Sequence, residues 1–166
     1  MPLFAMAYNA KLISTVLLMG LVVSCGFQLR GSYQIPIYLK SICLNTPSEN
    51  LLAKSLTKRL KQNSVAVDQP ESCANLDIVN EHLDRRTLSL FPNGQVAEYE
   101  LIYKVTFAVH LAPHPEQRYT IEILRDYQDN PNAVLAKNRE RDLILQEMRI
   151  DAADRIVRQL SSVRFY

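Results

Sequence analysis

The strongest constraint on the fold is an alternation of apolar and polar side chains that follows residue 100. Apolar side chains occupy every second position up to residue 111, and Lys104, Thr106 and His110 lie between them. A period of two predicts a β-strand with one buried face and one largely wet face. The buried face is expected to consist of Leu101, Tyr103, Val105, Phe107, Val109 and Leu111.

A tight turn and a second strand precede this alternation. Asn93-Gly94 is the pair that a type I′ hairpin turn prefers, because both central residues of that turn need positive φ. In the segment from Leu76 to Leu90, apolar side chains alternate with polar ones, but the alternation shifts at Leu83. This shift predicts a long strand interrupted by a bulge or twist. A further strand is expected at Tyr119–Ile123, after a break at Pro113-His114-Pro115.

Two helix patterns flank these strands. Leucines at 52, 56 and 60 follow a capping box at 46–49 and predict a helix over 47–62. Asn130-Pro131 predicts the cap and first turn of a final helix that runs to about Ser161. The apolar stripe of this helix, which must pack on the sheet, is Ile144, Met148, Ala152, Ile156 and Leu160.

Two short segments complete the order of elements, a strand within 35–44 and a shorter strand at 65–67. Strand, helix, several antiparallel strands and helix predict an α+β fold in one domain. The expected architecture is a two-layer sandwich, with two α-helices packed on one face of a roughly four-stranded mixed or antiparallel sheet.

The N-terminal segment has the layout of a signal peptide. Lys11 precedes an apolar run that ends at Val23, which is shorter than the roughly 20 residues needed to cross a bilayer core. Val22-Val23-Ser24-Cys25 resembles a bacterial lipobox. We therefore expect residues 1–24 to be a removed signal peptide, 25–34 an acylated tether and 35–166 a periplasmic domain. The start of translation is open between Met1 and Met6.

Cys25 is the expected lipidation site, with S-diacylglycerol on its thiol and N-palmitoyl on its amine, and no other cofactor is expected. Several acyl chains would hold the domain permanently at a membrane. Gly26 replaces the aspartate that retains such proteins in the inner membrane, so the class rule predicts sorting to the outer membrane.

Cys43 and Cys73 remain as an even pair in an oxidising compartment. A disulfide between them would close a loop of about 30 residues and contribute about 3 kcal/mol. Two buried free thiols are the open alternative.

Little in the chain points to catalysis, metal or nucleic acid. The net charge is +2, which provides no bulk field for nucleic acid. His82, His110 and His114 lack metal-ligand spacing, and no glycine-rich phosphate loop or nucleophile elbow occurs. Lys54, Lys58 and Lys61 lie opposite the leucines of the first helix, where they could meet lipid phosphates but are more simply a solvated face.

Three segments, in this order along the chain, resemble the LPS-assembly lipoprotein family LptE. They are Cys25–Gly31 after the lipobox, Phe91–Tyr99 at the hairpin, and Asp129–Glu140 at the start of the last helix. The resemblance implies two helices on a four-stranded sheet and a non-catalytic role. Such proteins plug the outer-membrane β-barrel LptD, assist its assembly and contact lipopolysaccharide on its way to the cell surface.

The resemblance also implies candidate site residues. Lys137 occupies the lysine of the family's Leu-Ala-Lys segment, where a basic residue contacts lipopolysaccharide. The family can place a basic residue directly before the hairpin Asn-Gly, but this chain has Pro92 there, so Arg85 and Arg86 are the candidates to compensate. Phe91, Asn93 and Gly94 form a candidate partner contact at the turn. The domain would then lie on the periplasmic side of the outer membrane and within the barrel lumen.

Two competing functions remain open on the sequence. A periplasmic lipid-binding carrier would need an enclosed apolar pocket between helices and sheet. An envelope hydrolase would need convergent titratable groups in a cleft, and the sequence contains no such cluster.

Overall fold

The computed structural model describes residues 33–47, 51–68 and 73–165. The expected signal peptide, Cys25 and most of the expected tether lie outside these residues. The elements in chain order are η1 (Ile37–Leu39), β1 (Ser41–Asn45), α2 (Leu51–Gln62), β2 (Ala66–Val67), β3 (Ala74–Leu90), β4 (Val96–His110), β5 (Gln117–Gln128), η2 (Pro131–Ala133) and α3 (Val134–Ser162).

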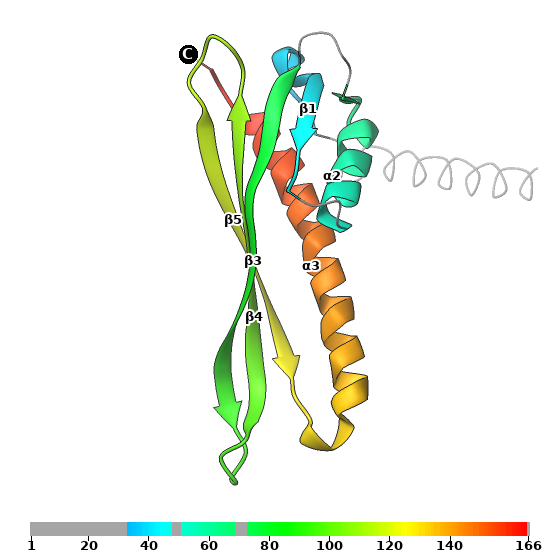
Figure 1. The fold of residues 1–166 in the computed structure, drawn as a ribbon, viewed down its shortest axis with the longest axis vertical. Coiled ribbons are helices and arrows are strands. Elements are labelled where there is room, and N and C mark those ends of the chain that lie inside the picture. Colours follow the sequence, from blue (N-terminus) through cyan, green and yellow to red (C-terminus); the bar gives the residue numbers. More distant parts are fainter. Residues whose placement is uncertain (1–32, 48–50, 69–72, 166) are drawn as a thin grey trace, which may run out of the picture. The chain divides into compact units, whose positions relative to one another are not determined.

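The strands form one mixed sheet in the order β2-β1-β3-β4-β5. β1 pairs in parallel with β2 and β3, whereas β3, β4 and β5 are antiparallel. Both α-helices cover one face of this sheet (Figure 1). The predicted α+β class is confirmed, and the sheet has five strands instead of about four because the short segment β2 pairs at its edge.

The central strand β4 presents the predicted apolar face to the helices. Its alternating side chains from Leu101 to Val109 are buried, and α3 contributes the stripe that covers them. The α3 residues that are fully buried are Met148, Ala152, Ala153, Ile156, Val157 and Leu160. The interface between sheet and helices is therefore a packed core.

A bulge in β3 produces the predicted change of phase. The pairing of β3 with β4 shifts between Ile78 and Asn80, which makes Val79 the extra residue. Because of this shift, Glu81 faces the helices, opposite Val105, although the preceding inward residue is Ile78. A second irregularity surrounds Leu88, which is 45% exposed and so lies outside the core.

Glu81 meets a basic partner beneath the helix layer. The Nε atom of Arg149 donates to Oε1 of Glu81 at 2.9 Å, and both side chains are largely shielded from solvent. Burial, and then the nearby Glu81 carboxylate, raise the pKa of Tyr103 well above its ordinary value. The charged pair thus joins the middle of β3 to the middle of α3.

The predicted strand over 35–44 is only partly correct. Residues 37–39 form a 3-10 turn, in which the backbone N–H of Leu39 donates to the Pro36 carbonyl at 2.9 Å. Ile35 and Leu39 are buried by this turn, whereas Ile37 is 89% exposed. The alternation of these side chains imitates a strand, but the turn buries only two of the three.

The predicted type I′ hairpin turn is wrong, although the hairpin itself forms. The N–H of Gly94 donates to the Phe91 carbonyl at 2.9 Å, so Pro92 and Asn93 are the central residues of the turn. Proline fixes φ near −65° and therefore favours an ordinary turn at this position. Only Gly94, at φ 82°, takes the left-handed conformation, as in a three-residue hairpin loop.

The last strand extends beyond its predicted bounds, whereas the last helix ends about where it was predicted to end. β5 covers Gln117–Gln128 rather than 119–123, because its charged and polar residues still pair with β4. The Asn130 side chain caps the next turn by accepting from the N–H of Asn132 at 3.0 Å, as predicted. The α-helical part, α3, begins at Val134 and ends at Ser162.

Cys43 and Cys73 form a disulfide with Cα atoms 5.5 Å apart. Cys43 lies in β1, and Cys73 directly precedes β3, the parallel neighbour of β1. Of the two states that the sequence left open, this structure contains the crosslink, which closes a loop of 30 residues around α2 and β2.

The partly buried charged pair between β3 and α3 predicts the effect of one substitution. Glu81→Ala is expected to lower the free energy of unfolding by about 2 kcal/mol, because it leaves Arg149 partly buried without its acceptor. Urea denaturation of both proteins measures this difference. Glu122→Ala, which removes the exposed ion pair with Lys104, is the control and should cost less than about 0.5 kcal/mol. Equal losses for the two variants would contradict this account.

Candidate functional site

Two turns lie together at one end of the domain. They are the β3–β4 hairpin and the turn from β5 into α3 (Figure 1). The backbone N–H of Asp129 donates to the Ala97 carbonyl at 2.9 Å and fixes the second turn against the base of the first. Between the turns opens a cavity of about 760 Å³, which we call the tip cavity.

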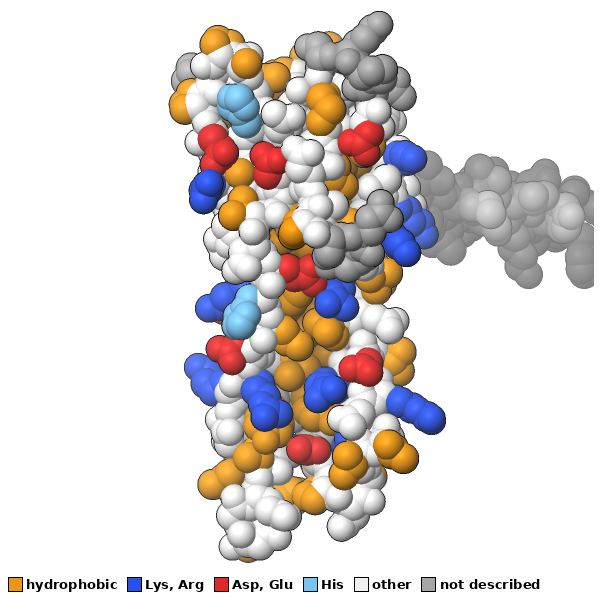
Figure 2. All heavy atoms as spheres, in the orientation of Figure 1, with side chains coloured by type: hydrophobic (Ala, Val, Ile, Leu, Met, Phe, Trp, Pro, Cys, Tyr) orange, Lys and Arg blue, Asp and Glu red, His pale blue; other side chains and the backbone are white. Residues whose placement is uncertain are grey.

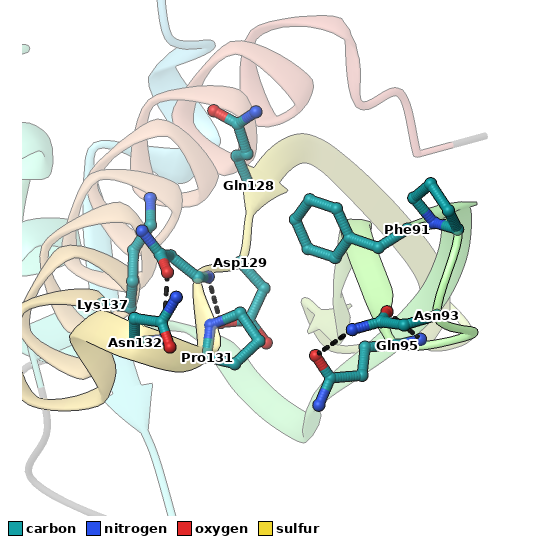
Figure 3. A pocket seen from close by; sticks show the side chains of 10 residues that line it. Phe91, Asn93, Gln95, Gln128, Asp129, Pro131, Asn132 and Lys137 are labelled. Atoms are coloured by element: carbon teal, nitrogen blue, oxygen red, sulfur yellow. Dashed lines mark hydrogen bonds between the residues drawn. The ribbon is translucent and has the colours of Figure 1, made fainter.

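Each turn supplies one wall of the tip cavity. The hairpin contributes Phe91, Pro92, Asn93 and Gln95, and the other wall consists of residues 128–132 and Lys137. The Nδ2 atom of Asn93 donates to Oε1 of Gln95, and Oδ1 of Asn93 accepts from the backbone N–H of Gln95, both at 3.1 Å. Figure 3 shows the Phe91 ring directed toward the opposite wall.

A smaller cavity of about 220 Å³ lies next to it, between the sheet and the start of α3. Three cations line this second space, Arg85 from β3 with Lys137 and Arg141 from α3, and we call it the cationic cavity. Lys137 also lines the tip cavity, as do Asp129 and Pro131, so the two spaces share one wall.

Lys137 is held by both strand and helix. Its ammonium lies 2.7 Å from the Glu140 carboxylate and 5.3 Å from the centre of the Tyr127 ring. The Tyr127 hydroxyl donates to the backbone carbonyl of Lys137 at 2.9 Å. Burial, and then the Asp129 charge, raise the pKa of Tyr127 above its ordinary value. The hydrogen bond fixes the start of α3 to the end of β5.

Arg85 and Arg86 point to opposite faces of the sheet. Arg85 is on the helix side, with its guanidinium carbon 4.8 Å from the centre of the Tyr99 ring. Arg86 is on the other side, where it pairs with Glu100 at 2.6 Å. Of the two candidates, only Arg85 lines a cavity with Lys137.

Apolar side chains lie beside these cations. Val134, which is 56% exposed, lines the cationic cavity together with Tyr99 and Leu101. Figure 2 shows an apolar strip in the lower half of the view with Lys and Arg side chains on both sides of it. The arrangement can hold an anionic group next to an apolar one, as an amphiphilic ligand requires.

Sequence reasoning missed two residues of this site. Arg141 lies four residues after Lys137 on the same helix, so helical spacing places it on the same face and could have revealed it. Tyr127 was missed because the strand that carries it was predicted to end at Ile123. Tyr127 lies an even number of residues after Ile123 and therefore on the same face of the strand. The charged residues around Tyr127 hide this alternation in the sequence.

The described residues contain no group of three or more side chains placed to hold a metal ion. Within the same ranges, no helix has both the length and the apolar character needed to cross a membrane.

Solved structures define the class to which this domain is similar. The rare lipoprotein B from Shewanella oneidensis matches with a TM-score of 0.67 and 44% identity, over 74% of this chain and 94% of that one. Lipoprotein B from Nitrosomonas europaea matches with a TM-score of 0.65 and 27% identity, over 82% and 91% of the two chains. The fold is thus that of a class of bacterial lipoproteins.

The family model LptE, described as lipopolysaccharide-assembly, matches residues 37–160. The LPS-assembly lipoprotein LptE of Yersinia pestis (strain Pestoides F) is 34% identical over 155 residues, which cover 89% of this chain and 75% of that protein. The chain belongs to the LptE family of lipopolysaccharide-assembly lipoproteins. The resemblance inferred from the sequence is confirmed at the level of the family.

Proposed function

We propose that this protein is a non-catalytic outer-membrane lipoprotein that contacts lipopolysaccharide at the hairpin end of its sheet. One observation carries the proposal: Arg85, Lys137 and Arg141 converge beside exposed apolar side chains in a member of a lipopolysaccharide-assembly family. Lipopolysaccharide combines phosphates with acyl chains, and recognition of it requires cations next to apolar surface.

Lys137 can exchange one anion for another. Its partner Glu140 is 48% exposed in its side chain, so that carboxylate can turn to solvent when a phosphate arrives. Arg85 has an aromatic ring beneath it and no carboxylate partner among the ion pairs of the described residues. The guanidinium therefore lines the cationic cavity with N–H donors that are available to bind a phosphate.

The membrane anchor belongs to the same proposal. Cys25 carries the S-diacylglycerol and N-palmitoyl groups, which hold the domain on the periplasmic side of the outer membrane. The lipobox sequence at residues 22–25 supports this assignment. A tethered domain has a high effective concentration near any partner in the same membrane, so weak contacts become sufficient.

The partner we propose is a β-barrel of the LptD type, whose lumen the domain enters and whose assembly it assists. The sheet face without helices is mostly polar, with the ion pairs Arg86–Glu100 and Lys104–Glu122 and the exposed apolar side chain of Leu124, which suits a wet lumen. Phe91 is 38% exposed at the hairpin and supplies an apolar anchor, held in place by the turn at Asn93 and Gly94.

The alternative of a lipid carrier has less support. A carrier would enclose its ligand between helices and sheet, and that space contains fully buried side chains of Tyr103, Phe107, Met148 and Ile156. The tip cavity lies between two turns, and the cationic cavity between the sheet and the start of α3 measures only about 220 Å³ and is lined by three cations.

The opposite orientation of two neighbouring arginines predicts a direct test. Arg85→Gln is expected to weaken binding of purified lipopolysaccharide about tenfold, because a phosphate loses one charge-assisted contact. Arg86→Gln removes the same charge from the other face and should leave the affinity within about twofold of the parent. Fluorescence titration with labelled lipopolysaccharide measures both, and equal weakening would indicate an effect of net charge alone.

The hairpin contact with the barrel predicts a second result. Affinity purification from native outer membranes through a C-terminal tag should recover a large β-barrel protein in equal amount. Phe91→Ala should reduce that recovery several-fold, because the exposed ring is the apolar anchor of the turn. Leu135→Ala, on a 79% exposed side chain of α3, is the matched control. Recovery of the lipoprotein alone, at good yield after mild extraction, would exclude the barrel partnership.

A further inference from the structure

The outer surface of α2 carries charge of one sign. The helix contains Lys54, Lys58, Arg59 and Lys61 and has no acidic residue. Arg59 is paired with Asp154 of α3 at 3.7 Å, but in the described ranges no acid lies within ion-pair distance of the three lysines. These lysines are exposed and occupy one side of the helix, which we call the α2 lysine face. Figure 2 shows basic side chains over this part of the molecule.

Apolar side chains lie next to the α2 lysine face. A groove of about 370 Å³ runs between α2 and α3, and its walls include Leu51, Lys54, Lys58 and Ile150. Ile150 is 42% exposed there. Cations around an accessible apolar side chain are the combination found on protein surfaces that rest on anionic membranes.

The chain enters the domain on this same pair of helices. The N–H of Tyr33, the first residue described, donates to the Asn63 side chain at the end of α2 at 2.6 Å. The Tyr33 hydroxyl donates to Asp154 of α3 at 3.0 Å. Only seven residues separate Tyr33 from Cys25 in the sequence, and they can span at most about 30 Å. An acylated Cys25 would therefore keep these helices close to the lipid headgroups.

The opposite face of the sheet lacks such a charge pattern. Its cations Arg86, Lys104 and Arg118 each have a carboxylate partner, at 2.6, 2.8 and 2.6 Å. Asp84, Glu98 and Asp126 on that face have no ion-pair partner among the described residues, so carboxylates outnumber cations there, and an anionic surface would attract the α2 lysine face in preference to it.

We propose that the α2 lysine face docks on anionic phospholipid headgroups of the membrane that holds the acyl anchor, with Ile150 at the level of the headgroups. The inference rests on the anchor assigned above. The contact orients the lipoprotein before it engages its partner and leaves the sheet face and the hairpin free. Each lysine near such a surface is expected to add roughly fivefold to the affinity.

Tryptophan fluorescence can test this orientation, because the chain contains no tryptophan. The acylated full chain would be reconstituted in vesicles of phosphatidylethanolamine and phosphatidylglycerol that contain brominated phospholipid and no lipopolysaccharide. Ile150→Trp provides the reporter on the proposed face. Leu124→Trp is the matched control, because Leu124 is 43% exposed and lies on the sheet face without helices.

We expect bromolipid to quench the Ile150→Trp variant at least threefold more than the Leu124→Trp variant. Lys54→Gln, Lys58→Gln and Lys61→Gln together should abolish this difference, and so should high salt, which screens the attraction. Circular dichroism would establish that each variant is folded.

The outcomes separate this inference from the anchor on which it rests. Mass spectrometry that finds lipid on Cys25, with equal or no quenching of the two reporters, would overturn the docking and leave the anchor intact. An unmodified Cys25 would overturn both. Stronger quenching of Leu124→Trp would show that the sheet face lies on the membrane instead.

Discussion

The antiparallel register of β4 with its two neighbours determines where each candidate side chain lies. Tyr99 is opposite Thr87 on one side and Tyr127 on the other, and this row of the sheet carries Arg85 and Lys137 to the same side. A slip of one residue would exchange Arg85 for Arg86 and turn the wrong arginine toward α3. The packing of Leu83 against the core opposes such a slip of β3, because the slip would turn Leu83 outward and bring Asp84 toward the helices.

The core and the candidate site occupy different parts of the same strands. Burial in α3 begins at Met148, more than three turns after Val134, where the helix starts. The first part of α3 is therefore not held by a continuous core. The Tyr127 hydrogen bond to the Lys137 carbonyl and the cap at Asn130 position it instead. This division leaves apolar and basic side chains accessible beside a rigid scaffold, as a binding site requires.

Periodicity sufficed to predict the parts of the fold in which burial and spacing agree. The strand at 101–111 and the stripe on the last helix are examples, because their apolar positions match one period over many residues. Periodicity failed at Ile37, because a turn can bury Ile35 and Leu39 as a strand would and still leave Ile37 exposed. It also failed at Asn93-Gly94, where the preceding proline selects another turn. That Arg141 lines one cavity with Arg85 depends on tertiary structure and was beyond sequence reasoning, whereas helical spacing alone could have linked Arg141 to Lys137.

Photo-crosslinking in living cells tests the central claim, contact of lipopolysaccharide with the cationic cavity, most directly. A benzophenone amino acid at Val134 would lie in the wall of that cavity, and one at Thr120 would lie on the opposite face of the sheet. The account predicts a lipopolysaccharide adduct at position 134 and a much weaker one, or none, at position 120. Adducts of equal strength at both positions, or none at 134 in a protein correctly located in the outer membrane, would contradict it.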